Sequence, residues 1–221
     1  MTGSVKRART YDSTRRQAQA RENRARVLAA ARAGFLAHGY AATTIPVVAV
    51  DAGVSVETVY KEFGNKAGLL KALFDIAIVG DDEPVPLMER DVIRRNQAEP
   101  DPRKKLRMYA AFYVERADRA MPYQLLARDA AANDPAAAEV WGRMVQERLT
   151  GMNHFARHLH DGGHLRADVS VEEARDVLWT FISAELWELL VIHRGWTAQR
   201  FGAWMGDMLV AALLPPKLFP R

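Results

Sequence analysis

Residues 43–63 read TTIPVVAVDAGVSVETVYKEF and predict two short helices joined by a turn at Gly53. Isolated helices of fewer than about 12–15 residues are marginal in water, so these two helices must pack against each other. Ala49 is small enough for a close crossing, Gly53 can adopt the positive φ of a tight turn, and Ser55 can cap the second helix. Together with the β-branched Val59, this spacing is typical of a helix-turn-helix. The alternative is an ordinary helical hairpin with a glycine turn.

Positive charge is concentrated immediately upstream of this segment. Residues 1–30 contain eight basic and two acidic residues, whereas the remaining chain contains 23 basic and 25 acidic residues. A basic end on a mildly acidic body is the charge distribution expected of a protein that meets a polyanion at that end. A solvated tail is the alternative, so the charge supports the helix-turn-helix interpretation without establishing it.

The rest of the chain also has helical periodicity, and no stretch has the alternating pattern typical of a β-strand. Asp101-Pro102 and Asp134-Pro135 each place a capping residue before a proline at the first helical position. Ser170 begins a capping box, and Thr197 can cap the last helix. We therefore predict an all-α fold of about nine helices, over about 13–38, 45–52, 56–62, 66–79, 102–118, 122–132, 135–160, 171–194 and 198–213.

Composition limits the classes of protein that this sequence can encode. The chain has 221 residues, of which 49% are hydrophobic, and it has no cysteine. That length suggests one or two domains with a core that needs no disulfide, and the apolar content argues against disorder. The lack of cysteine excludes thiol catalysis, thiolate zinc sites and iron–sulfur clusters. No secretory signal and no apolar stretch of about 18 residues is present, so we expect a soluble cytoplasmic protein that does not enter a membrane.

Many residues between 22 and 74 follow a known sequence pattern, in order and without insertions or deletions. They are Val27-Leu28-Ala29-Ala30-Ala31, Phe35, His38-Gly39-Tyr40, Thr43-Thr44-Ile45, Ala52-Gly53-Val54-Ser55, Thr58-Val59-Tyr60, Phe63, Lys66 and Leu69-Leu70. This set resembles the DNA-binding domain of TetR/AcrR-type bacterial transcriptional regulators. It covers about a quarter of the chain, and the helical remainder fits that family's divergent second domain by layout. The resemblance implies a basic arm at 1–21, a helix-turn-helix DNA-binding domain at 22–80, and an effector-binding and dimerisation domain at 81–221.

The resemblance also implies that the helix beginning at Ser55 enters the major groove of DNA. Val56 can pack on a thymine methyl group, and Lys61 can donate to a guanine or a phosphate. Glu57 departs from the small residue often found there, and it either accepts from a cytosine amine or only favours the helix N-terminus. The residues implied at the DNA are Thr44, Ser55, Val56, Glu57, Thr58, Tyr60, Lys61 and Lys66.

Thr44, Ser55, Tyr60 and Lys66 are the expected phosphate contacts in that set. The alternatives are that Tyr60 is partly core and that Lys66 is simply solvated. The first short helix carries Val47, Val50 and Asp51 where related proteins often have a basic residue. More of the phosphate binding is therefore expected from the arm, which contains Arg15, Arg16, Arg21 and Arg24.

The last two predicted helices carry more apolar and aromatic residues than one core-facing stripe requires. The resemblance implies that the helices near 171–194 and 198–213 pair with their twins in a four-helix bundle. A homodimer of this kind presents two recognition helices to double-stranded DNA with a near-palindromic operator. A well-buried helix pair within one chain is the alternative.

The middle helices carry aromatic side chains with a few polar groups, a composition that suits a small-molecule effector. The same stripe is also compatible with plain core. The candidate effector-binding residues are Phe112, Tyr113, Arg116, Trp141, Phe155 and His158.

Two other classes of function compete with a regulator. A metal-assisted hydrolase could use Asp161 or Asp168 with His154 and His158, which are four residues apart, but Arg157 would oppose a dication there. No catalytic, metal or cofactor motif supports that alternative, so we expect no catalytic residue, metal or cofactor. A non-DNA adaptor would use the tryptophan-rich helices but not the basic arm. The sequence favours a transcriptional regulator, specifically a repressor that a small-molecule effector releases from its operator.

Overall fold

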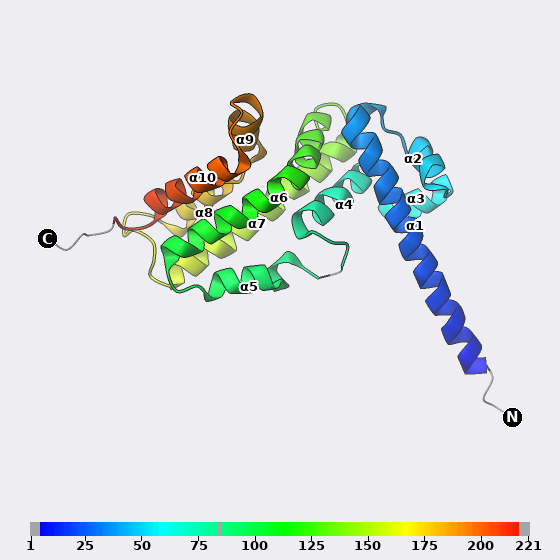
Figure 1. The fold of residues 1–221 in the computed structure, drawn as a ribbon, viewed down its shortest axis with the longest axis horizontal. Coiled ribbons are helices and arrows are strands. Elements are labelled where there is room, and N and C mark those ends of the chain that lie inside the picture. Colours follow the sequence, from blue (N-terminus) through cyan, green and yellow to red (C-terminus); the bar gives the residue numbers. More distant parts are fainter. Residues whose placement is uncertain (1–4, 84, 217–221) are drawn as a thin grey trace. The chain divides into compact units, whose positions relative to one another are not determined.

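The computed structural model describes residues 5–83 and 85–216, with side chains from residue 15 onward, and these residues form helices, turns and loops without a β-strand (Figure 1). This described part confirms the all-α prediction, with ten α-helices where about nine were predicted. Residues 1–4 of the predicted arm lie outside this described part, as do residue 84 and residues 217–221. The elements are α1 (Val5–Ala42), α2 (Ile45–Ala52), α3 (Val56–Phe63), α4 (Lys66–Val79), η1 (Leu87–Glu89), α5 (Asp91–Ala98), α6 (Pro102–Ala130), α7 (Pro135–Asp161), α8 (Val171–Phe181), α9 (Ala184–Trp187), η2 (Glu188–His193) and α10 (Ala198–Leu213). None of the described helices is both long and apolar enough to cross a membrane.

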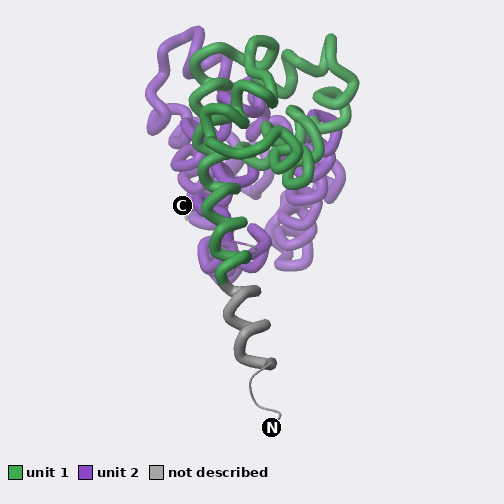
Figure 2. The backbone as a smooth tube through the Cα atoms, turned by 90° about the vertical axis from the view of Figure 1, so that its right-hand side faces the viewer, with its two compact units in different colours: residues 1–74, 126–140 green, residues 75–125, 141–221 purple. Residues whose placement is uncertain are grey.

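The helices divide into two compact units (Figure 2). Unit 1 extends to Phe74 and also includes Leu126–Val140, whereas unit 2 holds Asp75–Leu125 and the chain from Trp141 onward. The long helices α6 and α7 therefore each contribute residues to both units. Unit 1 thus joins the helix-turn-helix to a segment more than 50 residues away in sequence, beyond the boundary predicted at residue 80.

The predicted capping residues begin their helices. Side-chain oxygens of Asp101, Asp134, Ser170 and Thr197 each accept a hydrogen bond from an amide two or three residues ahead, at 2.9 to 3.2 Å. Because the first amides of a helix have no partner within it, these oxygens stabilise the helix starts. The predicted end of the first helix is also visible, since Gly39 interrupts α1 with φ 76° and ψ 179°.

Local signals were wrong at two places where tertiary packing decides the helix length. The sequence predicted two helices around Pro122, but α6 continues through it. The proline removes one backbone hydrogen bond, while the adjacent Met121 and Tyr123 are buried and hold the helix together by packing. Conversely, the single helix predicted over 171–194 divides, because Ser183 Oγ accepts from the Leu186 amide at 3.3 Å and begins a new helix.

No helix was predicted between residues 79 and 102, but this stretch contains α5. This helix is polar, and Asn96 is its one buried residue. The Asn96 amide nitrogen donates to the Lys105 carbonyl oxygen at 2.8 Å, which ties α5 to the first turn of α6. A short helix without an apolar stripe leaves no periodic signal in the sequence, so the pattern could not reveal it.

The core of unit 1 forms where α1, α2, α3 and α4 meet. Phe35 of α1, Val48 of α2, and Leu69 and Leu70 of α4 are almost fully buried. Val59 of α3 is 1% exposed and is the only residue of that helix in the core. Because α3 has eight residues, its orientation depends on what its neighbours hold in place.

Tyr40 connects three separate segments of unit 1. Its hydroxyl donates to Asp134 Oδ2 at 2.8 Å, and its carbonyl oxygen accepts from Lys66 Nζ at 2.9 Å. The Lys66 ammonium also lies 4.0 Å from the centre of the Tyr40 ring. Burial raises the pKa of Tyr40, as do the hydrogen bond and the charge of Asp134. The end of α1 is thereby fixed to the first turn of α4 and to the start of α7.

Unit 2 is built on α6. Its residues contact α7 in antiparallel order, since Lys105 meets His158 and Tyr109 meets Met152. On another side, α10 approaches closely, because a Cβ at Gly202 would lie 2.7 Å from a methyl group of Val114. An aromatic cluster of Tyr113, Trp187, Phe201 and Trp204 fills this region, with ring centres 5.5 to 6.3 Å apart.

Two glycine substitutions should have opposite effects on stability. Gly53 has φ 62° and ψ 42°, so Gly53→Ala is expected to lower the free energy of unfolding by about 1 kcal/mol. Gly142 lies exposed within α7 with open space around its Cβ position, so Gly142→Ala is expected to raise it by about 0.5–1 kcal/mol. Urea unfolding followed by circular dichroism measures both, and equal effects would contradict the turn geometry.

Tyr40→Phe should cost about 1 kcal/mol of stability at pH 7, because it removes one hydrogen bond to a carboxylate. The Tyr40 hydroxyl is the main cause that lowers the pKa of Asp134, with help from the Ala137 and Ala136 amides and the charge of Lys66. A carboxyl group whose pKa is lowered on folding stabilises the fold above its unfolded pKa, and this contribution is lost as the pH falls. The difference between Tyr40→Phe and wild type should therefore shrink below about pH 4. Urea titrations at pH 7 and pH 3 test this, and a difference that does not change with pH would contradict it.

Candidate nucleic-acid interface

The turn between α2 and α3 has the geometry that the sequence predicted. Gly53 adopts the left-handed conformation, and its amide donates to the Val50 carbonyl oxygen at 3.0 Å. The next amide, of Val54, donates to the Ala49 carbonyl oxygen at 3.0 Å. These bonds satisfy the last carbonyl groups of α2 and stop the helix. Ala49 is 1% exposed, as a close crossing requires.

The helix α3 turns one face inward and another outward. Ser55 Oγ accepts from the Thr58 amide at 3.2 Å and lies 3.0 Å from Thr58 Oγ1, so both hydroxyls serve the helix start. Val59 is buried, whereas Glu57, Tyr60 and Lys61 are exposed, and Val56 and Thr58 are intermediate. Tyr60 is 49% exposed, which leaves its hydroxyl available and excludes a full core role.

The end of α3 is held against the start of α4. A Cβ at Gly68 would lie 2.1 Å from the Phe63 carbonyl oxygen, so only glycine permits this approach. On the other side, Arg24 of α1 pairs with Glu62 at 2.7 Å, and its guanidinium lies 5.1 Å from the centre of the Phe63 ring. These contacts fix the last turn of α3 between α1 and α4.

Two of the expected phosphate contacts have roles within unit 1. Thr44 is exposed and caps α2, since its Oγ1 accepts from the Val47 amide at 3.5 Å. Lys66 was expected at a phosphate or in solvent. Its ammonium group donates one hydrogen bond to the Tyr40 carbonyl oxygen. Because an ammonium group has three donors, its remaining ones leave a phosphate contact possible in geometry. The phosphate role of both residues stays a prediction.

The outer face of α2 is apolar and acidic. Val47 and Val50 are 55% and 78% exposed, and Asp51 is also exposed. None of these side chains can bind a phosphate through an opposite charge. Three arginines of the predicted arm, Arg15, Arg16 and Arg21, are exposed on α1. Unit 1 therefore carries exposed positive charge on α1 although the outer face of α2 has none.

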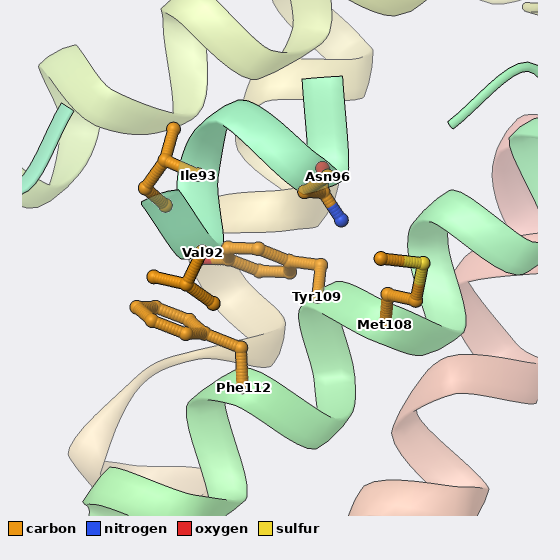
Figure 3. Close-up of a pocket in the computed structure, with 6 residues that line it drawn as sticks. All are labelled: Val92, Ile93, Asn96, Met108, Tyr109 and Phe112. Atoms are coloured by element: carbon orange, nitrogen blue, oxygen red, sulfur yellow. The ribbon is translucent and has the colours of Figure 1, made fainter. Parts of the chain in front are cut away.

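One of the predicted effector residues, Phe112, lines a small pocket. This pocket of unit 2 is lined by Val92, Ile93, Asn96, Met108, Tyr109 and Phe112 (Figure 3), so Phe112 alone belongs to the predicted set. The Arg116 guanidinium lies 3.8 Å from the centre of the Phe112 ring, and the Phe155 ring lies 5.0 Å from that of Tyr109. Tyr113 is buried in the aromatic cluster, and Trp141 is half-buried.

His158, another residue of the predicted effector set, has a buried partner. Its Nε2 lies 2.5 Å from Nζ of Lys105, which also donates to the Gln97 carbonyl oxygen at 3.1 Å. Burial lowers the pKa of Lys105. Burial and the charge of Lys105 lower the pKa of His158. Both groups therefore lose their proton at a lower pH than they would in water. The other histidine of the candidate zinc pair, His154, is exposed, and no group of three metal-ligating side chains occurs among the residues described.

One polar residue of unit 2 escaped the sequence analysis. Arg148 lies on α7, and two of its guanidinium nitrogens, Nε and Nη1, are buried without a hydrogen-bond partner. The signal was present, because Arg148 falls four residues after Met144 and four before Met152, on an otherwise apolar face.

The helices predicted to form a dimer carry exposed apolar side chains. Leu189 and Ile192 of η2 and Met208 of α10 are the largest of these. Trp187, Phe201 and Met205, which belong to the same predicted apolar set, are buried within unit 2. The aromatic load is thus partly core, and a smaller apolar surface is left for a partner.

Known proteins match the sequence of the helix-turn-helix segment. Residues 27–73 match the family described as "Bacterial regulatory proteins, tetR family". The HTH-type transcriptional regulator TtgR of Pseudomonas putida is 41% identical over 61 residues, which are 28% of this chain and 29% of that protein. The sequence match therefore spans less than a third of the relative's length.

Solved structures extend the likeness of the fold to most of the chain. A SmeT–triclosan complex is 23% identical and has a TM-score of 0.61, over 90% of this chain and 99% of that one. GusR of Salmonella enterica is 18% identical with a TM-score of 0.62, over 86% of this chain and 95% of that one. The helix-turn-helix segment is thus similar in sequence to the tetR family of bacterial regulatory proteins, and the all-helical fold is shared with these structures.

Proposed function

We propose that the chain binds an operator in double-stranded DNA as a homodimer, represses transcription there, and is released by a small-molecule effector. The observation that carries this proposal is α3, an eight-residue helix capped at Ser55 and anchored by Val59, with Glu57, Tyr60 and Lys61 exposed. A helix presented in this way after a tight turn suits the major groove. The matching relatives are named as transcriptional regulators, and we propose no catalytic activity.

Within this proposal the exposed residues of α3 contact bases and the capped helix starts contact phosphates. Val56, Glu57 and Lys61 are proposed at base edges, and Thr44, Ser55, Thr58, Tyr60 and Lys66 at the backbone. The ion pair of Arg24 with Glu62 supports the orientation of α3 relative to the arm. Arg15 and Arg21, exposed on α1, supply charge where the outer face of α2 lacks it.

The homodimer is proposed to form through the helices near 171–194 and 198–213. The exposed Leu189, Ile192 and Met208 support this assignment. Two-fold symmetry would place two copies of α3 about 34–36 Å apart, one turn of the double helix, and so select a near-palindromic site.

Release by an effector is proposed to act through α4, which follows α3 directly and contributes residues to both units. An effector shifts the DNA affinity only if it binds the two conformations unequally. The solved SmeT structure is a complex with triclosan, so a chain with this fold holds a small aromatic molecule.

Fluorescence anisotropy with fragments of the gene's own upstream region tests the proposal. One fragment should bind tightly, resist competitor DNA and lose affinity steeply with salt. An absence of DNA binding even at low salt would contradict the proposed function.

Lys61→Ala and Tyr60→Ala should each weaken binding to that fragment roughly 5- to 100-fold, because each removes one contact to a base or a phosphate. Sedimentation should show the same oligomeric state as wild type. Arg157→Ala is the matched control, since it removes one exposed positive charge from α7 in unit 2 and should bind as wild type does. Equal affinity of all three variants would count against α3 as the recognition helix.

Replacing Arg15 and Arg21 together by alanine should make the DNA affinity less dependent on the salt concentration. Each phosphate contact contributes about 0.9 to the slope of log affinity against log salt, so the slope should fall by about 2. The preference for the cognate fragment over other DNA should persist, because these residues are proposed to contact only the backbone. An unchanged slope would show that the arm does not touch DNA.

A further inference from the structure

Arg148 is a cation without a matching anion in the interior of unit 2. Its neighbours along the same face of α7, Met144 and Met152, are buried. Its guanidinium carbon lies 4.7 Å from the centre of the Trp179 ring of α8. Burial lowers the pKa of Arg148, and the negative charge of Glu185 offsets only part of this effect. Glu185 is the one carboxylate whose charge acts on the pKa of Arg148.

Unit 2 contains further buried donors without a partner. The buried side-chain nitrogens and oxygens without a partner, among the residues described, are Nε and Nη1 of Arg148, Nε of Arg116 and Nε1 of Trp179. All of these atoms are donors, and all belong to unit 2. Two tyrosines of α6 have the same shortage, since Tyr109 donates to the Met152 sulfur at 3.3 Å and Tyr113 to the Met121 sulfur at 3.6 Å. A thioether is a weak acceptor.

Such an arrangement is unfavourable in an empty protein, because a buried donor without an acceptor loses its hydration and gains nothing in return. What the interior lacks is an acceptor. Nε and Nη1 of a guanidinium form a planar fork that fits the two oxygens of a carboxylate. One arginine balances the single charge of a carboxylate but not the higher charge of a phosphate.

One of the two tyrosines lines the small pocket of Figure 3. Tyr109 and Phe112 line it, and the face of Phe112 carries the Arg116 guanidinium. Its cavity volume is about 30 Å³, enough for a few water molecules, whereas sites for drug-sized ligands measure about 300–1,000 Å³. A ligand must therefore displace side chains or α5. Asn96 is the one buried residue of α5, so the helix is weakly held.

We propose that the effector of this protein is a monocarboxylate with an apolar or aromatic body, and that Arg148 binds its carboxylate. Trp179 stacks on the guanidinium and can donate Nε1, while Tyr109 and Phe112 contact the body of the ligand. The inference rests on the proposed effector-controlled function and names the chemical class of the effector.

Scanning calorimetry of the full chain tests this with phenylacetate, 4-phenylbutyrate and octanoate, each beside its primary amide. A ligand at about ten times its Kd raises the Tm of a protein of this size by roughly 3–6 °C. At least one carboxylate should raise the Tm by this amount while its amide does not. Arg148→Gln should abolish the difference. Arg157→Gln, an exposed arginine of the same helix, should retain it.

The stability of the ligand-free variant supplies a second readout. Arg148→Met replaces an unpartnered buried charge by an apolar chain of similar length, so its Tm should be no lower than that of wild type. This variant also replaces Arg148→Gln in the ligand assay if the glutamine variant does not fold. A Tm several degrees lower would make Arg148 a structural residue and overturn the proposal. Equal shifts by every carboxylate and its amide, or a difference that survives in Arg148→Gln, would also overturn it.

Neither measurement contains DNA, so the result is independent of operator binding. Arg148→Gln should bind the operator fragment as wild type does. If wild type does not bind DNA, the proposed regulatory function fails, while the calorimetry still decides whether Arg148 holds a carboxylate.

Discussion

The Tyr40 hydrogen bonds are the constraint on which unit 1 depends. Helix α3 contributes one residue to the core, so its orientation comes from the helices around it. Tyr40 fixes those helices, because one side chain and its own carbonyl group bind the start of α7 through Asp134 and the start of α4 through Lys66. Without these hydrogen bonds, the α2–α3 pair would have no fixed orientation relative to α1.

Most of the fold was readable in the sequence because its signals are local. A capping side chain, a proline at the first turn or a glycine in a tight turn acts within four residues. Gly53 and Ser55 therefore marked the turn between α2 and α3 correctly, and Asp101 and Asp134 marked the starts of α6 and α7. The exceptions depend on distant contacts. Pro122 stays inside α6 because its neighbours are buried, and α5 is held through Asn96 on Lys105.

The candidate sites divide in the same way. Exposure of Glu57, Tyr60 and Lys61 followed from the helical period once Val59 was assigned to the core. The internal use of Lys66 could not be foreseen, since its partner is 26 residues away and is partly a ring face. In unit 2, the aromatic residues predicted an effector site, yet most of them pack on one another. The informative residue was Arg148, a single cation between two methionines.

Asp134 has a consequence for how unit 1 opens. One of its oxygens caps α7 by accepting from the amides of Ala136 and Ala137, and the other accepts from Tyr40. Fraying the first turn of α7 therefore frees the carboxylate that seats the end of α1, and the reverse also holds. In native-state hydrogen exchange, the two segments would be exposed in the same opening event although more than 90 residues separate them. A single carboxylate thus makes two distant pieces of backbone one cooperative element.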